Sequence, residues 1–251
     1  MRVAVFDCPL GIAGDMAVGA FLDAGMDFKV LKHELAKLNA KGWSVSLRET
    51  RSGAFRAQKF SVHIHGHSGS HGHEHVSLAD IGRMILTSRL HAKVKALAIR
   101  IFRMLGRAEA RVHGIPIQKV HFHEVGAIDS IVDIVSAAIC VHHLGIRRAF
   151  VRSLAVGRGL QRGSHGAMPI PVPGAYELLK GFWISQADYE QEMVTPTGAA
   201  ILAAVCQKGS RIPAMKTKAV GYGAGDRKFG AHAGFMRVSL GDIRGVSGRA
   251  R

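Results

Sequence analysis

The stretch that most constrains the fold is the opening VAVFDCPLGIAGDM, where an apolar run passes through a Gly-rich turn into a helical pattern. The run VAVFD predicts a buried strand that ends at Asp7. The turn PLGIAG follows, and the spacing after it predicts a helix from Asp15 to Ala24, with Asp15 as the N-cap and Gly25 as the stop. A buried strand followed by a helix is typical of a sheet covered by helices.

Hydrophobic periodicity predicts the remaining elements. Further helices are expected over residues 28–38, 77–88, 90–112, 127–144, 174–179 and 195–205, and further strands over 43–49, 59–65, 149–157, 217–225 and 235–241. The Gly- and Pro-rich stretch 157–175 predicts an irregular segment that no regular element can contain. The sequence therefore predicts an α/β or α+β fold, with a mixed sheet, packed helices, a long His-rich loop and Gly/Pro-rich loops.

Composition excludes several classes of protein. No apolar stretch approaches the ~20 residues that cross a bilayer, and no signal peptide is present, so we expect a cytoplasmic protein without a membrane partner. The three cysteines have no CxxC spacing, which indicates reduced thiols; Cys140 and Cys206 lie in apolar runs typical of a core. The formal net charge of +16 predicts an anionic ligand or partner. Nucleic acid is the weaker alternative, because the sequence has no RNP-like motif, no zinc finger and few aromatics for base stacking.

An internal tract, HIHGHSGSHGHEH, spans residues 63–75. Imidazole-rich segments suit Ni²⁺, Zn²⁺ or Cu²⁺. The Gly and Ser spacers make the tract flexible, and flexible ligands do not fix a coordination geometry. We therefore expect the tract to capture metal and not to act catalytically; the alternative is a solvent loop without a ligand. The candidate metal ligands in it are His63, His65, His67, His71, His73 and His75.

The segment HFHEVGAIDSIVD, residues 121–133, is a second candidate metal site. An extended start would project its two histidines to one face, and a helix from about residue 127 would place its two later aspartates, four residues apart, on one face. Such mixed nitrogen and oxygen clusters suit divalent ions from Ni²⁺ to Mn²⁺ or Mg²⁺. The alternative is a helix cap and hydrogen-bonded core histidines. The candidate catalytic residues are His121, His123, Glu124, Asp129 and Asp133, and the two histidines are also candidate metal ligands.

Two Gly-containing turns, PLGIAGD and TPTGAA, each open a predicted helix and could surround an anion with backbone N–H groups. Neither is a Walker or GxGxxG motif, so turn or cap chemistry is an equal alternative. A further histidine lies in the Gly/Pro-rich stretch, where a rigid backbone could present it to a ligand. The candidate cofactor-binding residues are Asp7, Gly11, Gly14, Asp15, His165, Thr195 and Thr197.

These stretches together resemble one family. FDCPLGIAGDM, the His-rich loop, VHFHEVGAIDSIVDIV, HGAMPIPVP, EMVTPTGAAIL and VGYGAG stand in this order in the sequence. The same order is found in the LarC family, the nickel insertion proteins of nickel-pincer cofactor synthesis. The resemblance covers residues 1–242, and a basic disordered tail is expected over residues 243–251.

The resemblance implies an activity. The family delivers Ni²⁺ to pyridinium-3,5-bisthiocarboxylic acid mononucleotide and forms one carbon–nickel and two sulfur–nickel bonds, with CTP hydrolysis and hence Mg²⁺ or Mn²⁺ in the overall reaction. The product is the cofactor of lactate racemase and related enzymes, so the resemblance implies a nickel insertase of the lyase class. Nickel, rather than zinc or copper, as the cargo of the His-rich loop also rests on the resemblance.

Two differences from the family pattern bear on function. Leu10 stands where family members have Ser. Full-length members also continue into a C-terminal domain associated with CTP binding and oligomerisation, which in some members is a separate chain. The resemblance thus implies a homo-oligomer and a partner C-terminal domain. The alternative function is a nickel store or metallochaperone without catalysis by this chain.

Overall fold

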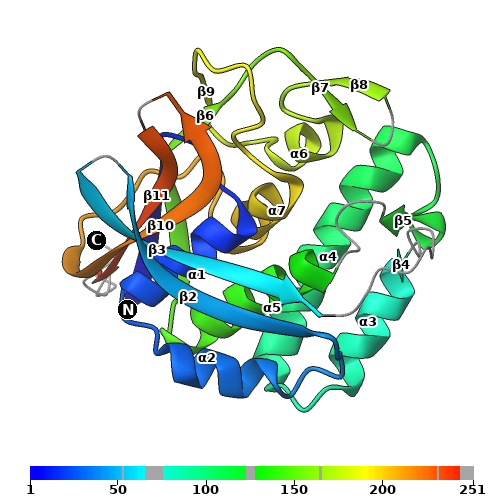
Figure 1. Cartoon of the computed structure of the whole chain (residues 1–251), viewed down its shortest axis with the longest axis horizontal. Helices are drawn as coiled ribbons and strands as arrows, with labels where there is room; N and C mark the ends of the chain where they lie inside the picture. Colours follow the sequence, from blue (N-terminus) through cyan, green and yellow to red (C-terminus); the bar gives the residue numbers. More distant parts are fainter. Residues whose placement is uncertain (53, 66–75, 123–127, 164–165, 231, 244–251) are drawn as a thin grey trace, which may run out of the picture.

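The computed structural model describes residues 1–52, 54–65, 76–122, 128–163, 166–230 and 232–243. A mixed seven-stranded sheet forms its centre (Figure 1), which confirms the expected α/β class. In spatial order its strands are β2 (Trp43–Ser52), β3 (Phe55–Ile64), β10 (Lys216–Phe229), β11 (His232–Asp242), β1 (Arg2–Cys8), β6 (Arg148–Val156) and β9 (Ser185–Gln186). Strand β1 runs parallel to β6 and antiparallel to β11.

The helices form layers that begin at the sheet. Helix α1 packs on β3 and β10, α5 packs on α1, and α4 packs on α5 and α7. Figure 1 shows this order, with β10 and β11 on one side of the view and α4 on the other. The helices are α1 (Gly14–Asp23), α2 (Phe28–Leu35), α3 (Leu78–Thr87), α4 (Ala92–His113), α5 (Ile128–His143), α6 (Pro173–Leu178) and α7 (Pro196–Val205), with a short 3₁₀ turn η1 (Ile117–Lys119).

Strand β1 is buried on both faces, as the apolar run VAVFD predicts. Phe6 lies on the helix side, where its ring meets that of Phe21 of α1 edge to face at 5.7 Å. Val5 lies on the opposite side, in a small second core with Phe150 and Ile243. Because both faces are covered, this strand fixes the position of the turn that follows it.

Helix α1 lies unusually close to β10. A Cβ at Gly223 would stand 1.8 Å from the backbone oxygen of Met16, and one at Gly221 would stand 2.1 Å from that of Ala20. No side chain fits in that space, so the motif VGYGAG is explained by the packing of a helix on a strand. This contact sets the N-terminal end of α1 against the sheet.

The prediction of an entirely irregular stretch over residues 157–175 is wrong. An antiparallel ribbon forms from β7 (Leu160–Gly163) and β8 (Gly166–Pro169), and α6 begins at Pro173. The two prolines that lie within these elements are compatible with them: Pro169 ends the ribbon, and Pro173 stands in the first turn of α6, where its missing N–H is not needed.

The start of α1 and the start of the predicted tail differ from the expectations. Asp15 is not the N-cap of α1: Ala13 occupies that position, and Asp15 lies in the first turn. In the predicted tail, Ile243 is buried and its N–H donates to the carbonyl of Met1 at 3.1 Å. Residues 244–251 lie outside the described residues.

A second small ribbon pairs β4 (Val76–Ser77) with β5 (His121–Phe122). Cys8, Cys140 and Cys206 are free and buried, as expected for two of them from their apolar context. Burial is the main cause that raises the pKa of the Cys8 and Cys140 thiols. These cysteines are therefore core residues and not thiolate ligands.

Candidate functional site

A cavity of about 380 Å³ opens where the N-terminal ends of α1, α5 and α7 meet β3. We call it the carboxylate pocket. The residues of its lining that carry its chemistry are Asp15, Lys59, Asp129, Asp133, Thr195 and Thr197. Three sequence segments that are far apart in the chain thus contribute to one site, and each contributes through the first two turns of a helix or the residue before it.

Six of the predicted site residues meet here. Gly14 and Asp15 come from the first Gly-rich turn, Asp129 and Asp133 from the start of α5, and Thr195 and Thr197 from TPTG. The expectation that the two α5 aspartates share one helix face is confirmed, because α5 begins at residue 128 and both line this pocket.

Asp133 is the most unusual carboxylate of the pocket. Its Oδ1 is buried and has no hydrogen-bond partner among the described residues. Burial, together with repulsion from Asp15 and Asp129, raises the pKa of Asp133 well above its usual value, and the charge of Lys59 opposes this only in part. A buried carboxylate oxygen without a donor is costly unless a cation or proton compensates it.

Asp15 is held in place by two donors. Its Oδ1 accepts the N–H of Met16 at 2.8 Å, and its Oδ2 accepts from Lys59 Nζ at 3.0 Å. Burial raises the pKa of Asp15, while the ion pair with Lys59 lowers it. The carboxylate therefore depends on a nearby positive charge to remain ionised.

Lys59, Asp226 and Glu192 line the pocket but were not among the sequence candidates. The side chain of Lys59 is only 4% exposed, and its Nζ lies 2.6 Å from Asp226 Oδ2. Glu192 is buried and accepts from Arg227 at 2.7 Å. Lys59 begins the predicted strand over residues 59–65, and nothing in that pattern marks it as a pocket residue.

The two Gly-containing turns form one wall. The N–H of Ile12 donates to Met193 O at 2.9 Å, and the N–H of Thr195 donates to Ile12 O at 3.0 Å. Gly11 makes this approach possible, because its φ is +81° and a Cβ there would stand 1.9 Å from Met193 O. Gly11 therefore contributes to the site by letting the two turns approach each other.

The threonines of TPTG shape the entry to α7. Thr195 is the N-cap, and its Oγ1 accepts the N–H of Gly198 at 3.2 Å. The hydroxyls of Thr195 and Thr197 lie 2.9 Å apart. Two hydroxyls thus stand next to the carboxylates at the positive end of a helix.

Asp7 lies outside the lining of the carboxylate pocket. Its carboxylate accepts hydrogen bonds from the Ser153 hydroxyl and the Arg237 guanidinium. These contacts tie β1 to its neighbours β6 and β11, so the described contacts of Asp7 join strands.

The histidines are placed only in part. His67, His71, His73, His75, His123 and His165, and also Glu124, lie outside the described residues. His63 Nε2 lies 2.7 Å from Ser46 Oγ, and His65 Nε2 lies 2.6 Å from Ser44 Oγ. Both imidazoles are exposed at one end of the β2–β3 pair, where the His tract begins.

His121 is exposed and pairs with Ser77 across the β4–β5 ribbon, outside the lining of the carboxylate pocket. A hydrogen bond from Ser77, with smaller effects of Arg83 and His121, lowers the pKa of Asp80.

Within the described ranges, no three His, Cys, Asp or Glu side chains are already arranged to hold a metal ion.

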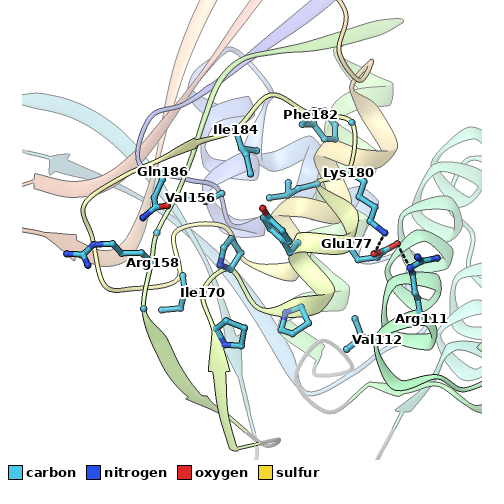
Figure 2. Close-up of a pocket in the computed structure, with 18 residues that line it drawn as sticks. Arg111, Val112, Val156, Arg158, Ile170, Glu177, Lys180, Phe182, Ile184 and Gln186 are labelled. Carbon is cyan, nitrogen blue, oxygen red and sulfur yellow. Dashed lines mark ion pairs between the residues drawn. The ribbon is translucent and has the colours of Figure 1, made fainter.

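A larger cavity of about 960 Å³ lies between the end of α4, α6 and the loop after β6 (Figure 2). We call it the apolar cavity. Its main apolar lining residues are Val112, Val156, Ile170, Leu179, Phe182 and Ile184. Figure 2 shows Glu177 between two cations: it pairs with Arg111 at 3.1 Å and with Lys180. Arg158, also in the lining, pairs with Asp188 at 2.7 Å.

Of the helices in the described part of the chain, none has both the length and the apolar character that a bilayer crossing requires.

Comparison with known proteins identifies relatives over nearly the whole chain. A relative from Citrifermentans bemidjiense named "Putative nickel insertion protein" is 42% identical over 248 residues, which is 99% of this chain and 63% of the relative. Relatives from Desulfitobacterium hafniense and Akkermansia muciniphila are 40% and 42% identical over 97% and 96% of the chain. Both carry the name "Pyridinium-3,5-bisthiocarboxylic acid mononucleotide nickel insertion protein".

The chain spans about 60% of the length of these relatives: 63%, 59% and 60%, respectively. No solved structure matches it. The profile of one family, described as "Nickel insertion protein", matches residues 4–250. The chain therefore belongs to the nickel insertion protein family.

Proposed function

We propose that this chain binds nickel and takes part in its insertion into pyridinium-3,5-bisthiocarboxylic acid mononucleotide. The observation that carries the proposal is that three of the segments on which the family resemblance rests, PLGIAGD, AIDSIVD and TPTGAA, meet in one pocket of carboxylates and hydroxyls. Two relatives are named for this substrate. The finer features are part of the same proposal: a lyase-class reaction, dependence on CTP with Mg²⁺ or Mn²⁺, maturation of lactate racemase-type enzymes, and a cytoplasmic location.

In this proposal two sites have different roles, one in collecting the nickel ion and one in positioning it. The six histidines of residues 63–75 collect Ni²⁺, and the carboxylate pocket, together with His121, His123 and Glu124, positions the ion. Metallation of the pyridinium ring at C4 replaces a C–H bond by a C–Ni bond, so a base must accept one proton. A carboxylate with a raised pKa is suited to that role once it has lost its own proton, because it then holds the transferred proton more firmly than an ordinary aspartate.

The apolar cavity is the proposed place for the organic substrate. Its volume lies in the range of small-molecule sites, and its walls offer apolar surface to an aromatic ring. The cations Arg111, Arg158 and Lys180 in its lining could exchange their present carboxylate partners for the thiocarboxylates or phosphate of the ligand. The segment from Gln186 to Thr195 connects this lining to that of the carboxylate pocket.

The experiment supplies the purified chain with Ni²⁺ and the mononucleotide, with and without CTP, Mg²⁺ and a separately produced C-terminal domain from a relative. Mass spectrometry of the small-molecule fraction detects the nickel-containing product. We expect product in the complete mixture and none without this chain. Absence of product from the complete mixture, with a relative of full length active in parallel, contradicts the proposal.

A nickel store or metallochaperone is the second candidate. It is favoured by the lack, among the described residues, of a preformed three-ligand metal cluster. The chain would then retain nickel and release it to an acceptor without making a carbon–nickel bond. Formation of more than one equivalent of nickel-containing product per chain decides for insertion over storage.

A further inference from the structure

Lys59 lines the carboxylate pocket and pairs with two of its carboxylates. Its ammonium lies 3.0 Å from Asp15 Oδ2 and 2.6 Å from Asp226 Oδ2, and its side chain is 4% exposed. A buried lysine is rare unless it is paired. Here it stands between two carboxylates that come from different elements, α1 and β10.

The pocket has more negative charge than this one ammonium balances. Glu192 has its own partner in Arg227. Asp15, Asp129 and Asp226 remain, with Lys59 as the cation of the described lining. Asp133 is left out of this count, because its raised pKa favours the protonated form in the metal-free pocket. The buried Oδ1 of Asp133 also has no hydrogen-bond donor among the described residues. The pocket therefore has both the charge and an unused ligand atom for a second, doubly charged cation.

We propose that Lys59 is an internal counter-cation that a divalent metal ion displaces from between Asp15 and Asp226, with Asp133 as a further ligand. The inference rests on the proposed function and names how the same pocket takes up and gives back its ion. The flexible four-carbon stem of lysine lets the ammonium leave and return, which the planar fork of arginine does less readily. No covalent bond changes in this exchange.

Among the described residues no three ligands are arranged for a metal ion. The ammonium lies between Asp15 and Asp226, so the exchange requires it to leave and the carboxylates to close on the incoming ion. The exchange also has a functional consequence, because a competing internal cation keeps the metal affinity moderate. A protein that hands on its metal needs such an affinity, whereas a permanent metal site does not.

The test measures Mn²⁺ binding by the full chain, from the loss of the free Mn²⁺ signal in electron paramagnetic resonance. Mn²⁺ prefers oxygen ligands, so the His tract contributes little. Lys59→Met removes the competing charge and is expected to bind Mn²⁺ ~10-fold more tightly. Lys59→Arg keeps the charge and is expected to bind no more tightly than wild type. An equal or weaker affinity of the folded Lys59→Met variant overturns the proposal.

Asp226→Asn provides a second test that does not depend on a buried residue, since the Asp226 side chain is 83% exposed. As a ligand, Asp226 should weaken Mn²⁺ binding when its charge is removed, by ~5-fold or more. If Asp226 only tethers Lys59, Asp226→Asn would tighten binding, and that result also overturns the proposal.

These measurements are separable from the proposed function. Tighter Mn²⁺ binding by Lys59→Met without nickel insertion by any variant would contradict the proposed function and support the displacement of Lys59 by a metal ion. Insertion by wild type, with unchanged Mn²⁺ affinity in Lys59→Met, would contradict the displacement of Lys59 and support the proposed function.

Discussion

Gly14 and Asp133 are in contact at the point where α1 meets α5: a Cβ on residue 14 would stand 2.7 Å from Asp133 Oδ2. The absence of a side chain at Gly14 therefore makes room for the carboxylate of Asp133. We expect Gly14→Ala to displace this carboxylate and weaken divalent-metal binding. Overpacking costs about 1–3 kcal/mol of folding free energy, partly offset by about 1 kcal/mol of helix propensity.

Gly82→Ala is the matched control, because Gly82 also lies in a helix and a Cβ there would meet nothing within 4 Å. Urea unfolding should show a stability gain for Gly82→Ala and none for Gly14→Ala. Equal Mn²⁺ affinities of the two variants would contradict this role of Gly14.

The stability of the chain should depend on pH through Asp133. Its pKa is raised in the folded state, mainly by burial, so the folded chain holds a proton that the unfolded chain releases near pH 3.9. Above that pH the unfolded state binds fewer protons, and stability falls as pH rises toward the folded pKa. Asp133→Asn removes this loss.

We therefore expect metal-free Asp133→Asn to be more stable than wild type at neutral pH by ~1 kcal/mol or more. Denaturant unfolding at several pH values measures the difference, which should shrink as pH falls toward 4. A variant that is less stable than wild type at pH 7 would show that the carboxylate is compensated in the folded state.

The sequence predicted the elements that local pattern controls. Strand β1, helix α1 and the start of α5 follow from apolar runs, periodicity and turn residues, and they carry Asp15, Asp129 and Asp133 into one pocket. The resemblance added the order of the motifs, but the meeting of the residues depends on how α1, α5 and α7 pack.

Lys59 and Asp226 could not be predicted in this way. Lys59 lies on β3, and the packing of α1 and β10 against that strand buries it. Asp226 follows the glycines of β10, whose role is packing. The ribbon of β7 and β8 was missed for a related reason, since its stability comes from pairing between strands and not from the intrinsic preference of Gly and Pro.

The His tract should determine how much nickel the chain holds and not whether it can be inserted. Deletion of residues 66–75 removes His67, His71, His73 and His75. We expect the nickel content after equilibrium dialysis to fall, with the insertion rate at saturating Ni²⁺ within about twofold of wild type, because flexible ligands capture but do not position a metal. Replacement of the four histidines by serine, which keeps the loop length, is the control. Loss of insertion at saturating Ni²⁺ in both variants would assign the tract a role beyond collection.

The apolar cavity should affect the organic substrate and not the metal. Phe182→Ala removes apolar wall, and Arg158→Gln removes a cation of the lining. Both should raise the KM for the mononucleotide about 5-fold or more, with Mn²⁺ affinity unchanged. Trp183→Ala is the control, since Trp183 is 86% exposed and outside the lining. Unchanged KM values for both variants would place the substrate elsewhere.

We propose that the carboxylate pocket positions the nickel ion for insertion. The most direct measurement is the insertion rate of Asp133→Asn at saturating Ni²⁺, in the complete mixture with CTP and the C-terminal domain. We expect a loss of about 100-fold or more, because the substitution keeps the shape of the side chain and removes the charge that faces the bound ion. A rate within twofold of wild type, from a variant whose fold is intact, would contradict it.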